Sequence, residues 1–169
     1  MKKILLIAFL FATAMAAGAQ DTFTAYLLDD DITTNIRNSP KGAVVFTLSS
    51  EEFYVFDLTA PQNGWWRVVS FWNAENYDED TSLEGSDTDE YWIHSSVLAV
   101  DTRNYGGQTI YLRAAPSEDA AVVAQYDEEM RFRPVDIQDG WVKVKLDYTD
   151  IEGWIEAEWL CGNPLTNCS

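Results

Sequence analysis

Apolar and polar residues alternate along most of the chain after residue 20, with the period of two that is typical of half-buried β-strands. The clearest stretches are residues 53–58, 65–71 and 141–146, which are rich in β-branched and aromatic residues. Ser-Pro, Asn-Gly, Asp-Gly and Gly-Gly pairs lie between such stretches and predict turns. No segment after residue 20 sustains a helical period. The pattern therefore predicts an all-β fold built from short strands.

The alternation also predicts which way the side chains face. In residues 141–146, Val142 and Val144 share one face with Leu146, and these aliphatic residues are expected to face the core. Trp141 then lies on the opposite, lysine-bearing face, at the start of the strand. In residues 65–71 the same reasoning places Trp65 on the outer face.

Several of these features occur twice along the chain. "QNGWWRV" at residues 62–68 and "QDGWVKV" at residues 138–144 each place a Gly-Trp pair before an alternating strand, and "AVV" and "EE" also recur. Four pairs of residues are separated by 76 positions: Arg37 and Arg113, Pro40 and Pro116, Gly64 and Gly140, Trp65 and Trp141. A fixed separation of this kind indicates an internal structural repeat.

Each repeat ends in a second tryptophan motif. The first is "YWIHSSVL" at residues 91–98 and the second is "GWIEAEWL" at residues 153–160. An acidic insertion at residues 75–90, with eight acidic and no basic residues, lengthens the first repeat. This segment does not fit the EF-hand calcium loop, because Leu83 stands where that loop requires glycine. We interpret it as a solvated loop and predict no metal site.

The order of these motifs resembles the bacterial SH3 (SH3b) domain, in two copies that together cover nearly all of the chain after residue 19. The resemblance implies two small SH3-like β-barrels in tandem, each with five strands. Residues 20–100 would form the first module, with the acidic insertion, and residues 101–169 the second, with a tail bounded by cysteines. The family's usual work is binding, often to bacterial cell-wall peptides. Tyr91 departs from the family pattern, which has glycine before the closing tryptophan.

Residues 1–19 have the pattern of a secretory signal peptide. Two lysines precede a short apolar run, and Ala17-Gly18-Ala19 provides a cleavage site. The apolar run is short for a membrane span. We expect an exported protein, periplasmic or extracellular, with no membrane insertion after cleavage.

The formal net charge of −17 further limits the partners. A chain this acidic does not neutralise phosphates, so we predict no nucleic-acid binding. Its field favours cationic partners, although the charge also keeps an exported protein soluble. The net charge fits either role.

The two cysteines and the single histidine give no sign of an enzyme. Cys161 and Cys168 bound the turn "CGNPLTNC", and in an oxidising compartment they are expected to form a disulfide with each other. His94 is the only histidine, and neither cysteine precedes it in the order used by cell-wall peptidases of the papain type. We predict no catalytic residue and no cofactor.

We expect the ligand on the second module, between Trp141 and Trp159, with Trp65 contributing a weaker site opposite Val97 in the first. The hypothesis is a non-enzymatic binding protein for cell-wall peptide or a protein segment. One alternative is an acidic accessory or inhibitor protein that holds a basic partner, and a less favoured one is a hydrolase of unknown type. In the structural alternative, the tryptophans only seal the barrel rim. The sequence leaves the oligomeric state open.

Overall fold

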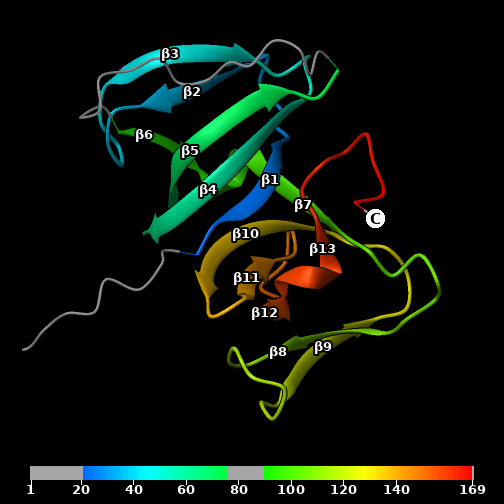
Figure 1. Ribbon diagram of the computed structural model, residues 1–169. Coiled ribbons are helices and arrows are strands. Elements are labelled where there is room, and N and C mark those ends of the chain that lie inside the picture. Colours follow the sequence, from blue (N-terminus) through cyan, green and yellow to red (C-terminus); the bar gives the residue numbers. More distant parts are fainter. Residues whose placement is uncertain (1–20, 76–89, 169) are drawn as a thin grey trace, which may run out of the picture.

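The computed structural model describes residues 21–75 and 90–168, and the described chain is all-β (Figure 1). Two single 3₁₀ turns, η1 (Ser95–Val97) and η2 (Ala157–Trp159), are the helical elements of these residues. The strands are β1 (Phe23–Leu27), β2 (Thr33–Arg37), β3 (Val44–Ser49), β4 (Tyr54–Gln62), β5 (Trp65–Asn73), β6 (Tyr91–His94), β7 (Leu98–Thr102), β8 (Ile110–Arg113), β9 (Val122–Tyr126), β10 (Arg131–Gln138), β11 (Trp141–Lys145), β12 (Glu152–Glu156) and β13 (Leu160–Cys161).

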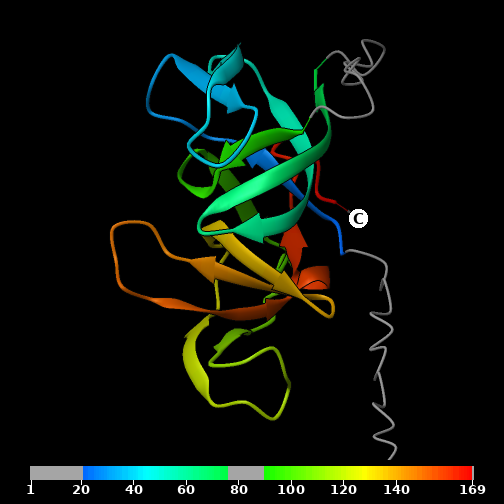
Figure 2. The same cartoon turned by 90° about the vertical axis from the view of Figure 1, so that its left-hand side faces the viewer.

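All of these strands belong to one open antiparallel sheet. The order is β3-β2-β6-β5-β4-β1-β7-β10-β11-β12-β8-β9, and β13 joins at β7. The sheet curls so that its first strands and its last strands form two lobes, with β1, β7 and β10 between them (Figures 1 and 2). The structure thus confirms the all-β prediction, but the described pairings give an open sheet and do not by themselves establish two closed barrels.

The strand pairing repeats along the chain, and β7 takes part in both repeats. In the first set, which we call unit one (β1–β7), β1 pairs with β4 and with β7. In the second set, unit two (β7–β13), β7 takes the place of β1 and pairs with β10 and with β13. The other pairs correspond one to one: β2-β3 with β8-β9, β2-β6 with β8-β12, β4-β5 with β10-β11, and β5-β6 with β11-β12.

The two Gly-Trp motifs form equivalent hairpin turns. Asn63 and Gly64 have φ values of 52° and 80°, and Asp139 and Gly140 have 50° and 80°. Positive φ at both central residues is the type I′ geometry, which Asn-Gly and Asp-Gly favour because their twist matches the flanking strands. Each turn therefore starts a new strand with its tryptophan as the first residue.

The larger of two hydrophobic core clusters in the described residues runs through both units. Phe56 and Ile93 from unit one and Phe132 and Val144 from unit two are at most 1% exposed and belong to the same cluster. Trp66 is fully buried, and its indole Nε1 donates to the backbone oxygen of Pro134 in unit two at 3.1 Å. The two units are therefore packed together, not joined as separate bodies by a linker.

The predicted module boundary, between residues 100 and 101, falls inside β7. The predicted signal peptide (residues 1–19) and residues 76–89 of the acidic insertion lie outside the described residues. Within the described ranges, no helix has the length and apolar character needed to cross a bilayer.

The C-terminal tail is held against unit one. Cys161 and Cys168 form the predicted disulfide, with 5.5 Å between their Cα atoms. Between them, Gly162 lies directly on the backbone of β1, where a Cβ would overlap the carbonyl group of Thr24. Glycine at this position allows the tail to pack closely on the strand.

Replacing Gly162 by alanine is expected to lower the free energy of unfolding by about 1–3 kcal/mol, because rigid backbone has to move to admit the new methyl group. Chemical denaturation measures the change. Gly106→Ala is the matched control, since a Cβ there meets only the flexible side chain of Gln108. Equal stabilities for the two variants would show that the tail does not pack on β1 in solution.

Candidate binding site

Trp141 and Trp159 lie on the wall of one cavity in unit two, of about 210 Å³. The cavity lies between β8 and the turn η2, beside the start of β11. It is lined by Thr109, Ile110, Tyr111, Arg113, Trp141, Ile155, Glu156 and Trp159. We call it the aromatic groove. The structure brings together the two tryptophans that the sequence predicted as the centre of a site.

Strand register places Trp141, and hydrogen bonds hold Trp159. Trp141 pairs with Gln138 on β10 and with Glu156 on β12, directly after the type I′ turn. The indole Nε1 of Trp159 donates to Oε2 of Glu156 at 3.3 Å, and the Trp159 carbonyl accepts from the backbone N–H of Arg103 at 2.9 Å. Both tryptophans are half-buried. Because both side chains are partly buried and line a cavity, part of each ring is available to a ligand, which suits a binding surface.

The charged side chains of the aromatic groove already make contacts within the protein. The Nη1 of Arg113 donates to the carbonyl oxygen of Ala120 at 3.0 Å, and its guanidinium lies 6.0 Å from the centre of the Tyr111 ring. This arginine is therefore held against the protein. Glu156 is the carboxylate of the groove, and its Oε2 accepts from Trp159, so the groove combines aromatic planes with one carboxylate and one guanidinium.

Unit one has an equivalent cavity, of about 270 Å³. Thr33, Asn35, Arg37 and Trp65 line it at the positions of Thr109, Tyr111, Arg113 and Trp141, and His94 and Val97 replace Glu156 and Trp159. Asp29 and Asp31 also contribute. The repeat thus carries the groove in both units, but unit one has lost the second tryptophan and the tyrosine.

Trp65 is more buried than expected for a residue on the outward face of its strand. It lies opposite Trp66, as the alternation predicted, yet it is only 9% exposed. His94 packs edge-on at 4.9 Å between ring centroids, and the Arg37 guanidinium lies 5.9 Å from the ring centre. In unit two the equivalent Arg113 lies over Tyr111 instead, which leaves Trp141 open. Trp65 is therefore the least accessible of the three predicted ligand contacts.

His94 is held in a structural arrangement. Its Nδ1 accepts from the backbone N–H of Ser96 at 3.2 Å and lies 2.8 Å from the Ser96 hydroxyl. Partial burial lowers the pKa of His94, and the charge of Lys41 lowers it further, so the ring is neutral near pH 7. Both cysteines are in the disulfide, so neither offers a thiolate to this histidine.

The comparison with known families agrees with the place of the groove. Residues 108–160 match the bacterial SH3 domain family. This SH3 segment begins just before β8 and ends at β13, and it contains every residue that lines the aromatic groove. The match covers unit two without its first strand, β7.

The chain was also compared with curated proteins and with solved structures. No curated protein matches the chain. Among solved structures, NlpC1 from Trichomonas vaginalis is 14% identical with a TM-score of 0.33, over 90% of this chain and 50% of that one. NlpC2 from the same organism is also 14% identical, with a TM-score of 0.32, over 85% of this chain and 49% of that one. The chain spans about half the length of these two proteins.

Sequence reasoning missed Tyr111 and Glu156 as members of the groove of the SH3 segment. Tyr111 alternates with the buried Ile110 and Leu112 on β8, so the period of two marked it as outward-facing. Glu156 stands in the closing motif three residues before Trp159. Neither residue is singled out without the pairing of β8 with β12, which brings the two strands together.

Proposed function

We propose that the chain consists of two SH3-like modules that share β7. Two observations support this proposal: the family match over residues 108–160, and the strand pairings and turns of unit one, which repeat those of unit two. In this interpretation, β7 is both the last strand of the first module and the first strand of the second.

The function that we propose is non-enzymatic binding of a short cell-wall peptide by an exported protein. The observation that carries it is the shared cavity of Trp141 and Trp159 inside the SH3 segment. Two half-buried aromatic planes offer broad contacts to an extended backbone, and such anchors concentrate binding energy. Glu156 would face a ligand ammonium group, which agrees with the acidic character of the chain.

Replacing Trp159 or Trp141 by alanine is expected to weaken binding to cell-wall peptide by about 30-fold each, the effect of losing a hot-spot aromatic residue. Isothermal titration with a synthetic stem peptide, together with a pull-down on purified sacculi, measures the loss. Phe53→Ala is the control, because Phe53 is an aromatic residue that is 41% exposed and lies outside the aromatic groove.

Circular dichroism separates a binding defect from a folding defect in these variants. Glu156→Gln provides a second test that leaves both rings in place, with an expected loss of about fivefold for a ligand that carries an amine. Folded tryptophan variants that bind as well as the parent protein would show that the two rings only seal the rim and that the site lies elsewhere.

A second candidate function rests on the net charge of −17, which suits an acidic accessory or inhibitor protein for a basic partner. Salt distinguishes the two functions. Binding through the acidic surface should be lost as ionic strength rises, whereas the aromatic groove should keep most of its affinity. Hydrolysis is the least favoured function, because both cysteines are in the disulfide and neither offers His94 a thiolate nucleophile.

A further inference from the structure

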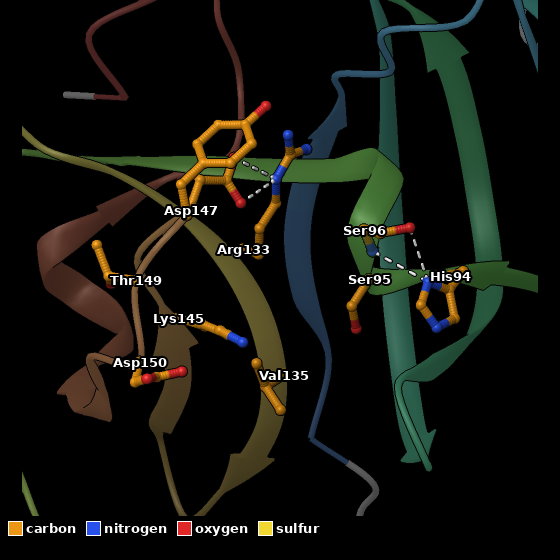
Figure 3. A pocket seen from close by; sticks show the side chains of 10 residues that line it. His94, Ser95, Ser96, Arg133, Val135, Lys145, Asp147, Thr149 and Asp150 are labelled. Atoms are coloured by element: carbon orange, nitrogen blue, oxygen red, sulfur yellow. Dashed lines mark hydrogen bonds and ion pairs between the residues drawn. The ribbon is translucent and has the colours of Figure 1, made fainter.

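A separate cleft of about 440 Å³ lies between the two units. Figure 3 shows its lining side chains, with those of unit one facing those of unit two across the opening. Unit one contributes His94, Ser95 and Ser96, and unit two contributes Arg133, Val135, Lys145, Asp147, Tyr148, Thr149 and Asp150. The volume lies in the range of small-molecule sites. The cleft shares no residue with the aromatic groove.

The two walls of the cleft are fixed relative to each other. The Nη1 of Arg133 donates to the carbonyl oxygens of Leu28 at 2.8 Å and Leu98 at 2.9 Å, while its Nε bonds to Asp147 at 2.8 Å. On the other side, Trp66 Nε1 donates to Ser95 Oγ and to the Pro134 oxygen, both at 3.1 Å. A ligand would therefore enter a site that is already formed.

The loop that carries Tyr148 and Asp150 is also fixed. The backbone N–H of Leu146 donates to the Ile151 carbonyl at 3.0 Å, and the Thr149 hydroxyl accepts from the N–H of Ile151 at 3.1 Å. This closed turn holds Asp150 at the wall of the cleft. Tyr148 is 95% exposed and lies at the same wall, where its ring is free to cover a bound molecule.

The charges in the cleft are the decisive feature. Arg133 is paired with Asp147, and on the neighbouring strand Lys143 is paired with Glu152. Within residues 21–75 and 90–168, by contrast, neither Lys145 nor Asp150 forms an ion pair. An ammonium and a carboxylate thus line one preformed cavity without neutralising each other.

We propose that this cleft binds a small zwitterion, such as a free amino acid or a dipeptide. The Lys145 ammonium would bind the ligand carboxylate and the Asp150 carboxylate would bind the ligand ammonium group, with Tyr148 at the mouth. The proposal goes beyond peptide binding in the aromatic groove and does not depend on it.

Three related probes test whether both charges are required. Glycylglycine carries both charges near neutral pH, N-acetylglycylglycine only the negative one, and glycylglycinamide only the positive one. NMR titration of the whole chain should shift the backbone amide signals of Ser96 and Lys145, with an affinity for glycylglycine about fivefold higher than for either other probe.

Two substitutions then assign the contacts. Lys145→Gln should remove the advantage of glycylglycine over glycylglycinamide, and Asp150→Asn should remove its advantage over N-acetylglycylglycine. Lys143→Gln is the matched control, because this lysine lies on the same strand and is already paired with Glu152. It should leave all three affinities unchanged.

Several outcomes would overturn the proposal. These are no shift with glycylglycine, equal shifts with all three probes, or loss of binding in the Lys143→Gln variant to the same extent as in Lys145→Gln. Trp159→Ala should leave the glycylglycine titration unchanged, so failure of the zwitterion site and failure of the aromatic groove give different results.

Discussion

Replacing Trp66 by alanine is expected to lower the free energy of unfolding by about 3–5 kcal/mol, the usual effect of removing a large aromatic side chain from a core. Trp66 is fully buried and packs against Phe23, with 6.1 Å between ring centroids. Its Nε1 bonds to Ser95 Oγ and to the Pro134 oxygen of unit two. The substitution therefore leaves a cavity at the junction of the two units and removes a hydrogen bond between them.

Chemical denaturation, followed both by circular dichroism and by tryptophan fluorescence, measures this change. Because Trp66 supports both units, the two probes should still report one shared transition at a lower denaturant concentration. Phe53→Ala is the control, since Phe53 is an aromatic residue of the same unit that is 41% exposed and should lose about 1 kcal/mol or less. Equal losses in both variants would show that Trp66 does not join the units.

Trp66→Phe separates packing from hydrogen bonding at this position. The phenyl ring fills part of the cavity but leaves the Pro134 oxygen without its indole donor. We expect this variant to fall between the parent protein and Trp66→Ala.

Much of the fold was readable from the sequence because strand alternation and turn chemistry are local. The stretches at residues 65–71 and 141–146 became β5 and β11, and each begins at the predicted tryptophan. Val142 and Val144 are fully buried, as the alternation predicted. Leu146 lies just beyond the end of β11 and still packs against the core.

The sharing of β7 was not readable in this way. Residues 98–102 form a strand that pairs with β1 and β13 and also with β10. A strand that belongs to two repeats cannot be recognised from its periodicity, because the same alternation of side chains fits pairing with either neighbouring strand. The sequence repeat predicted two modules in tandem, and the structure adds that their strands belong to one continuous open sheet.

The candidate site was predictable in part. Trp141 and Trp159 followed from the repeat and the closing motif, and the fold places both on one cavity. The accessibility of Trp65 was not predictable, because it depends on Arg37 and His94, which approach from other strands. The cleft between the units was missed for the same reason, since the residues that line it come from both units.

Replacing Arg133 by methionine is expected to lower the free energy of unfolding by about 2–4 kcal/mol, the second-largest loss of stability that we predict. The Arg133 side chain is 13% exposed, and its Nη1 donates to two backbone carbonyl oxygens, those of Leu28 and Leu98. Methionine keeps the apolar stem but removes these bonds.

The ion pair of Arg133 contributes little to this loss, because its partner Asp147 is 37% exposed and stays hydrated when the guanidinium is absent. The carbonyl oxygens of Leu28 and Leu98 account for most of the loss, since they lie where unit one meets unit two.

Arg131→Met is the matched control: Arg131 lies on the same strand and also pairs with an aspartate, Asp101, but its side chain is 53% exposed. Its removal should cost about 1 kcal/mol or less. Denaturation curves of the two variants, compared with the parent protein, measure the difference. If Arg133→Met is no less stable than Arg131→Met, the carbonyl contacts do not hold the units together, and Trp66 and the core carry that role alone.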